Sequence, residues 1–132
     1  MSTSCTHSIA FPSASAFSFL TGEQYDLLRA NGLMARLHEE RGELFDPDPI
    51  VKLYVPGMQA TWLLSSIDPR TPRIAFGLAD LGFPEIGFIS LDELEELRAG
   101  GELLVRQDRH FHPVKSLSEY ARDARREGHI VT

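Results

Sequence analysis

The sequence predicts an α+β fold, in which a small antiparallel sheet of about five strands carries two to three helices packed on it. Short runs rich in β-branched and aromatic residues follow one another between positions 50 and 90. Tight turns separate them, which is typical of an antiparallel meander. Patterns of the form Ser/Thr-x-x-Glu/Gln, which can cap the start of a helix, stand on both sides of these runs. An apolar content of 42% and a mean hydropathy of −0.16 are those of an ordinary folded globule.

The first part of the chain is predicted to be helical as far as a proline-rich stop. Thr21 and Gln24 form a capping box, because the threonine hydroxyl can accept from a backbone N–H and the glutamine can reach back. The Asn31-Gly32 pair is a break signal, so a second short helix is predicted over residues 33–41. The DPDP stretch at 46–49 excludes regular structure, since each proline lacks a donor and restrains the residue before it.

Strands and two further helices complete the expected order. Strands are predicted at residues 50–55, 61–67, 73–81 and 85–90. A helix then opens at Ser90, buries Leu91, Leu94 and Leu97 on one face and ends at Gly100-Gly101. Residues 102–111 are predicted to form the last strand, and a final helix runs from the Ser116–Glu119 capping box to a stop at Gly128.

The stretch FGLADLGFPEIGFIS at 76–90 predicts a hairpin in which Asp80 and Glu85 face each other across a loop at 81–84. In that register the Cβ atoms of the two acids lie roughly 5 Å apart. The pair could bind a cation, share a proton, act as the close carboxylates of retaining glycosidases do, or stand in water at the turn. We favour hydrated or turn-capping acids, because a single tryptophan is thin support for a sugar cleft. Phe88 is predicted to cover Gly77 in a hairpin that is central to the sheet.

Length predicts one domain over residues 21–132, preceded by a loosely held arm at 1–20. The arm is rich in serine, contains no charged residue and lacks the basic start of a secretory signal. No apolar run approaches the ~20 residues that cross a bilayer. The lone cysteine, Cys5, cannot form an internal disulfide and has no flanking charge to activate it, which predicts a cytoplasmic protein without a catalytic thiol.

The formal net charge of −6 is unevenly distributed. Residues 1–104 carry 15 acids and 7 bases, whereas residues 105–132 carry 4 acids and 6 bases. The acidic body as a whole disfavours nucleic acid and anionic lipid, although spaced carboxylates can also imitate a phosphate backbone. Arg122 and Arg126 align on the last helix and could contact nucleic acid or an acidic partner. The acids interleaved with them make intrahelical ion pairs the simpler interpretation.

One more group of residues could carry chemistry. If residues 108–112 are extended, Asp108, His110 and His112 share one side, where neighbours ~6.6 Å apart could give two ligands to a metal. A zinc site would need further ligands, and surface histidines flanking a buried Phe111 are the simpler interpretation. No phosphate loop, nucleophile elbow, paired-cysteine or His-Glu-x-x-His motif is present. No cofactor and no metal are therefore predicted.

The blocks TWLL, DP, FGLADLG, PE-G-ISL-EL, D-HF-P and SLSEYA, in this order from about Pro49 to Gly128, resemble a bacterial family known as domain of unknown function 2958. The resemblance implies proteins that are often carried by plasmids and other mobile elements, with no agreed activity. We therefore expect a small non-enzymatic cytoplasmic protein that acts through a protein partner, as a regulator or counter-defence inhibitor. The alternatives are nucleic-acid binding through the basic C-terminal helix, and a small hydrolase or metalloprotein built on Asp80, Glu85, Asp108 and His110.

Overall fold

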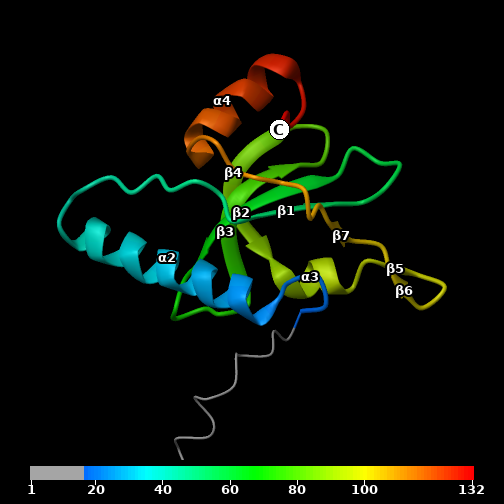
Figure 1. Cartoon of the computed structure of the whole chain (residues 1–132), viewed down its shortest axis with the longest axis horizontal. Coiled ribbons are helices and arrows are strands. Elements are labelled where there is room, and N and C mark those ends of the chain that lie inside the picture. The colour runs from blue at the N-terminus through cyan, green and yellow to red at the C-terminus, as the bar shows by residue number, and fades with distance from the viewer. Residues whose placement is uncertain (1–16) are drawn as a thin grey trace, which may run out of the picture.

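The structure, a computed structural model, describes residues 17–132 and contains a five-stranded antiparallel sheet with three helices (Figure 1). The predicted α+β class is confirmed. The helices are α2 (Gly22–Glu40), α3 (Leu91–Glu95) and α4 (Leu117–Glu127). The sheet has the order β4-β3-β2-β1-β7, from β1 (Val51–Tyr54), β2 (Thr61–Ile67), β3 (Ile74–Asp80), β4 (Pro84–Ser90) and β7 (Arg106–Gln107). A second small sheet pairs β5 (Arg98–Ala99) with β6 (Glu102–Leu103).

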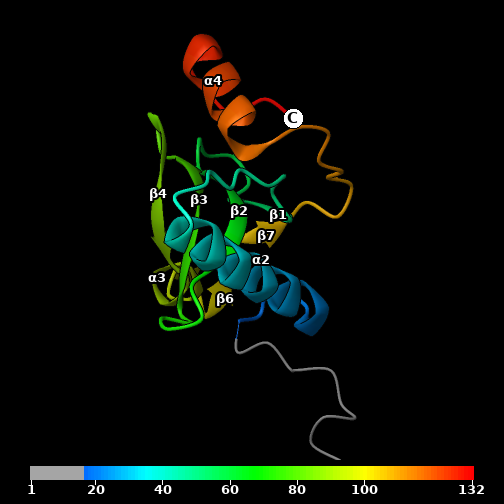
Figure 2. The same ribbon diagram turned by 90° about the vertical axis from the view of Figure 1, so that its left-hand side faces the viewer.

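The two faces of the main sheet are covered by different elements. One face packs against residues 17–20, the first half of α2 and helix α3. Its buried strand residues are Val51, Leu53, Trp62, Leu64, Ile67, Ala75 and Ile89. The other face packs against α4; its core is Leu63, Leu78, Leu117, Tyr120, Ala121, Ala124 and Ile130. Figure 2 shows α4 at one end of the sheet and α2 crossing in front of the other. None of the helices within residues 17–132 is long and apolar enough to cross a membrane.

The predicted helix starts are confirmed by their caps. Thr21 and Gln24 form a complete capping box at the start of α2, and Ser116 and Glu119 form another at the start of α4. Ser90 caps α3 with a single side-chain bond. Each cap satisfies backbone N–H groups that have no partner within the helix, so these short motifs fix where the helices begin.

Helix α2 runs through Asn31-Gly32 without interruption, so the predicted break is wrong. Strand β1 pairs with β2 only as far as Leu64, which leaves the end of β2 without a strand on that side. Helix α2 fills this place. The Nδ2 of Asn31 donates to the Ser65 carbonyl at 2.9 Å, and a Cβ on Gly32 would stand 1.8 Å from the Ile67 carbonyl oxygen. Asn31 and Gly32 therefore allow α2 to pack closely against β2. The Asn-Gly pattern alone does not show that such a contact exists.

The packed part of the chain begins before the expected boundary at residue 21. Phe17 and Phe19 are buried in the core, at 2% and 5% exposure. Between them, Ser18 binds the Glu95 carboxylate through both its backbone N–H and its hydroxyl, at 2.8 Å each. This segment is therefore part of the domain. The remainder of the expected arm, including Cys5, lies outside the described residues.

The chain after α3 also departs from the prediction. Helix α3 ends at Glu95 and not at Gly100, because residues 98–103 fold back as the β5–β6 hairpin. The strand predicted at 102–111 is divided, since Val105 turns into the core between β6 and β7. Only β7 joins the main sheet, beside β1.

The β3–β4 hairpin is confirmed, but its predicted register is wrong by one residue. Asp80 stands opposite Pro84 and not opposite Glu85, so the loop comprises residues 81–83. Gly82 adopts a φ of 111° in this loop, and its N–H donates to the Asp80 carboxylate at 3.0 Å. Because a shift of one residue moves a strand's side chains to the opposite face, the two acids lie on different faces of the sheet.

The register also changes the neighbours of Phe88. It stands opposite Phe76, with ring centroids 5.6 Å apart, while Gly77 stands opposite Gly87. The predicted cover of Gly77 by Phe88 is therefore wrong. Strand β4 ends the sheet and Phe88 is 78% exposed, so the hairpin lies at the edge and not at the centre.

Candidate ligand-binding pocket

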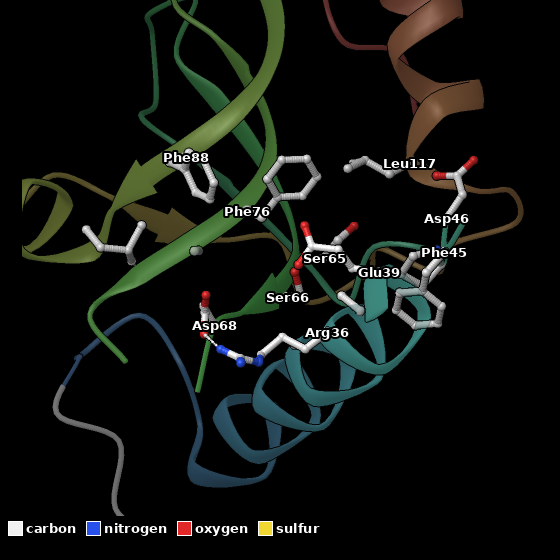
Figure 3. Close-up of a pocket in the computed structure, with 15 residues that line it drawn as sticks. Arg36, Glu39, Phe45, Asp46, Ser65, Ser66, Asp68, Phe76, Phe88 and Leu117 are labelled. Atoms are coloured by element: carbon white, nitrogen blue, oxygen red, sulfur yellow. Dashed lines mark ion pairs between the residues drawn. The ribbon is translucent and has the colours of Figure 1, made fainter. Parts of the chain in front are cut away.

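A cavity of about 280 Å³ opens between the second half of α2, the end of β2 and the outer strands β3 and β4 (Figure 3). Leu117, the first residue of α4, closes one side of it. The polar lining consists of three acids, one arginine and two serines, and three phenylalanines supply most of the apolar wall. This is the type of concave, mixed surface that binds small groups.

The two serines reach the pocket through an irregularity in β2. Leu64 pairs with Gly77 and Ser66 pairs with Phe76, so Ser65 is an extra residue with no partner on β3. Such a β-bulge redirects side chains and is common beside binding sites. Ser65 is only 2% exposed, and its buried Oγ has no hydrogen-bond partner within residues 17–132.

Arg36 enters the pocket from α2 and forms an ion pair at its wall. Its Nη1 lies 3.7 Å from Oδ1 of Asp68, the pair marked in Figure 3. Asp68 also accepts the backbone N–H of Arg70 at 2.9 Å. The side chains of the pair are 28% and 34% exposed, so solvent screens their attraction and the pair contributes less than about 1 kcal/mol. The main effect of the pair is to hold the Arg36 guanidinium beside the Asp68 carboxylate.

Aromatic rings form two walls of the pocket. The edge-to-face pair of Phe76 and Phe88 comes from neighbouring strands and is partly open to solvent. Phe45 lies across from them, after the end of α2, and stacks on His38 at a centroid distance of 4.8 Å. The His38 ring in turn contacts the Met34 carbonyl through Nδ1 at 2.8 Å, which fixes Phe45 against the helix.

Asp46 joins the loop after α2 to the start of α4. Its carboxylate accepts the backbone N–H of Ser118 at 3.1 Å and also the Ser118 hydroxyl. Partial burial of Asp46 would raise the pKa of its carboxyl group, but the hydrogen bonds from Ser118 and Ser116 outweigh it and lower that pKa. The ionised carboxylate is thus an additional cap on α4, at the end where the helix dipole favours negative charge.

This cap is expected to make stability depend on pH. Because folding lowers the pKa of Asp46 below 3.8, the contribution is fully present above pH 3.8 and is lost as the pH falls through the lower folded-state pKa. Asp46→Asn should cost about 1 kcal/mol at neutral pH and reduce the loss of stability in acid. Urea unfolding across this pH range measures both. Asp48→Asn in the same loop is the control, and an equal effect of the two variants would contradict the assignment.

Asp80, predicted to be one of an exposed pair of acids, is 1% exposed. Its carboxylate accepts the backbone N–H groups of Gly82 and Ile130, at 3.0 Å each, and Nε2 of Gln59 at 3.1 Å. The Asp80 carboxylate caps the turn, which confirms the turn-capping interpretation for this residue. It also links the β3–β4 hairpin to the chain after α4. The other interpretation, a hydrated carboxylate, is wrong for Asp80. Glu85 is exposed on the opposite face.

The segment from Asp108 to His112 is a turn, so the predicted extended arrangement is wrong. Asp108 Oδ1 accepts the N–H of His110 at 2.9 Å, and the Asp108 carbonyl accepts the N–H of Phe111 at 3.3 Å. The Asp108 carboxylate also lies 3.6 Å from Nζ of Lys52. Both histidines are exposed. In the part of the chain that the structure describes, no three His, Cys, Asp or Glu side chains are grouped as metal ligands.

The arginines of α4 are interleaved with acids as the sequence indicates. Arg126 lies 3.2 Å from a carboxylate oxygen of Asp123 and 3.2 Å from one of Glu127, which confirms intrahelical ion pairing for this residue. Arg122 is exposed on the same helix. Asp80 and Glu85 lie on opposite faces of the sheet, and Asp80, Glu85, Asp108 and His110 are not grouped as metal ligands within residues 17–132.

Sequence reasoning did not identify the residues that form the pocket. Arg36, Phe76 and Phe88 come from segments assigned to helix and strand for their periodicity alone. One signal was present: Ser65-Ser66 interrupts the otherwise apolar run TWLLSSI. Hydroxyl groups in a buried strand normally have hydrogen-bond partners, so two adjacent serines indicate a polar environment at this end of β2.

The fold and the pocket together define a small α+β domain with a cavity lined by polar and aromatic side chains. The chain belongs to the family described as Protein of unknown function (DUF2958), whose match covers residues 19–131. The match confirms the resemblance found in the sequence and extends it towards the N-terminus, so that it includes α2 and its share of the pocket. No curated protein and no solved structure matches the chain.

Proposed function

We propose that this protein is a small non-enzymatic binding module that acts through a protein partner, by pairing strand β4 with an extended segment of that partner. The observation that carries the proposal is the outer edge of β4. This strand is seven residues long, keeps an unbroken register with β3 and ends the main sheet. An edge of this kind presents a row of backbone donors and acceptors to a further strand.

The edge lacks the protection that native sheets usually have. Exposed edges are commonly blunted by bulges, lysines, prolines or a covering element. In β4 the only proline is the first residue, Pro84, and the only charged residue is Glu85. Large apolar side chains lie at and near its ends, with Phe83 81% exposed and Phe88 78% exposed. Figure 2 shows β4 at the outer margin of the sheet.

Charge complementarity indicates what the partner segment carries. The chain has a net charge of −6, and Glu85 is the only charged residue of β4. In strand addition the main chain supplies affinity, while side chains at alternate positions supply specificity. We therefore propose a segment in which apolar and basic residues alternate. A cytoplasmic role as a regulator or counter-defence inhibitor of a mobile element is supported by the family resemblance alone, and the genes beside this one would test it.

Selection from a displayed library of random linear peptides tests the proposal. Selected peptides should protect the β4 amides from hydrogen exchange and bind Phe88→Ser more than about tenfold more weakly. Methylating alternate backbone nitrogens of such a peptide should abolish binding for one set of positions only, because one edge of a strand faces its partner.

The control variant is Leu33→Ser, which removes another exposed apolar side chain, 54% exposed on α2. It should bind the selected peptides as the parent protein does. Protection confined to α2, or equal loss in both variants, would contradict pairing at β4. A dimer that Phe88→Ser dissociates would assign the edge to a second copy of this chain and would also contradict the proposal.

A further inference from the structure

The pocket beside α2 contains two buried polar atoms that make no hydrogen bond within residues 17–132, Ser65 Oγ and Arg36 Nη1. Nη1 of Arg36 has an ion-pair partner, the Asp68 carboxylate at 3.7 Å. Ser65 Oγ is buried without a hydrogen-bond partner in the described part of the chain, and Ser65 lines the cavity. A buried hydroxyl that makes no hydrogen bond costs free energy, so structures normally satisfy it. The bulge that places Ser65 there adds a further departure from regular structure at the same point. Both features are accounted for if a ligand supplies the missing partner.

The charges that line the pocket favour a cation as that ligand. Arg36 is the only basic residue of the lining, and Asp68 lies beside its guanidinium. Asp46 is held by Ser118 at the start of α4. Glu39, one turn after Arg36 on α2, makes no side-chain hydrogen bond or ion pair within residues 17–132. Outside the lining, Nε of Arg70 also lies 3.8 Å from the Asp68 carboxylate, and Arg122 attracts the carboxylate of Asp46. The negative charge that has no basic partner within residues 17–132 is therefore that of Glu39.

The aromatic walls favour the same chemistry. Ring faces carry partial negative charge and attract ammonium and guanidinium groups placed over them. Phe76 and Phe88 offer such rings at one wall, with exposures of 36% and 78%, and Phe45 offers another. An anion would meet these ring faces and the three carboxylates. Only Arg36 would attract it, through an Nη1 that makes no hydrogen bond and lies 3.7 Å from Asp68.

We infer that this pocket binds an organic cation, an ammonium or guanidinium group on a short aliphatic stem. The inference goes beyond the proposed pairing at β4. The pocket shares Phe88 with that strand, but its polar groups Ser65 and Glu39 come from β2 and α2, so Glu39→Gln tests the pocket without altering β4. Glu39 and Ser65 accept hydrogen bonds from the cationic head, and Phe76 contacts the stem. A cavity of about 280 Å³ is small for a cofactor and suits one such group. The group belongs either to a free amine or to a lysine or arginine side chain of another protein.

Titration followed by amide chemical shifts tests this inference with butylamine, butylguanidine and butyrate, three probes that share a stem. The two cations should give saturable shifts at the pocket, and butyrate should not. Glu39→Gln should weaken cation binding by about tenfold or more. Ser65→Ala should also weaken it, yet raise the melting temperature, because it removes the unused buried hydroxyl. A lysine peptide compared with its acetylated form distinguishes a protein side chain from a free amine as the source.

Glu40→Gln is the matched control, since Glu40 follows Glu39 on α2, is exposed and does not line the pocket. It should change the affinity less than about twofold. Equal weakening by both variants would reduce the effect to general attraction by an acidic surface and overturn the site. Competition by butyrate would assign the pocket to anions through Arg36. An absence of saturable shifts with either cation would overturn the inference that the pocket binds organic cations. It would not bear on the proposed strand pairing at β4.

Discussion

Replacing Gly32 with alanine is expected to destabilise the protein by about 3 kcal/mol, although the same change within an exposed helix stabilises by about 1 kcal/mol. The new Cβ would stand 1.8 Å from the carbonyl oxygen of Ile67 and 2.6 Å from its carbonyl carbon. These are backbone atoms of a buried strand and cannot rotate aside, so α2 must move away from β2. The hydrogen bond from Asn31 to the Ser65 carbonyl would be lost with that movement. Urea unfolding followed by fluorescence of the buried Trp62 measures the loss.

Two other glycines provide the comparison. Gly77 and Gly87 stand opposite each other in the β3–β4 hairpin. A Cβ on Gly77 would lie 2.0 Å from the Leu63 carbonyl oxygen, whereas a Cβ on Gly87 would meet nothing within 4 Å. Gly77→Ala should therefore destabilise as Gly32→Ala does, and Gly87→Ala should change stability by less than about 1 kcal/mol. A Gly32→Ala protein as stable as the parent would show that α2 does not pack against β2 at this distance.

Replacing Asp80 with alanine is expected to cost about 3 kcal/mol. The substitution leaves the backbone N–H groups of Gly82 and Ile130 without their acceptor, and that of Ile130 is buried. It also releases the chain after α4 from the β3–β4 loop, so the core cluster to which Ile130 belongs loses part of its cover. Calorimetry or urea unfolding measures the stability, and amide exchange at Ile130 should accelerate more than exchange within β2.

Glu85→Ala is the matched control for Asp80→Ala. The sequence predicts that the two acids face each other across the loop, whereas in the structure they lie on opposite faces of the sheet. Glu85 is exposed, so its removal should change stability by less than about 0.5 kcal/mol. Asp80→Asn keeps one of the two oxygens that accept the three hydrogen bonds, so its loss of stability should lie between those of Asp80→Ala and Glu85→Ala. Equal effects of Asp80→Ala and Glu85→Ala would mean that the two acids do share one environment at the turn.

Much of the architecture follows from local patterns. Thr21, Ser90 and Ser116 mark helix starts because a side-chain cap acts within four residues of itself. The strand at Thr61–Ile67 is predicted without error, because the turn signal Pro56-Gly57 precedes it and Asp68-Pro69 follows it directly. Residues 46–49 are irregular, as their prolines require. These features are determined by neighbours in the sequence, and a single sequence is enough to find them.

The errors share one cause. Asn31-Gly32 is a break signal in isolation, but the contact with Ile67 uses the missing side chain to bring two elements together. The register at Asp80 depends on whether the loop has three or four residues, and Gly82 permits the shorter loop by its positive φ. The turn at Asp108 forms because its own carboxylate binds the N–H of His110. In each case the local sequence allows two conformations, and contacts within the folded domain determine which one forms.

The sequence by itself determined the α+β class and the helix starts, because capping, turn chemistry and hydrophobic periodicity act over a few residues. The family was indicated by the resemblance of its ordered sequence blocks, which the family match confirms. Only the tertiary structure decided which carboxylates are buried, which strand is the edge, and which side chains form the pocket. Arg36, Ser65 and Phe88 lie on α2, β2 and β4, far apart in the chain, and meet through the packing of the helix on the sheet. Such a meeting depends on register and packing over the whole domain, and no local pattern encodes it.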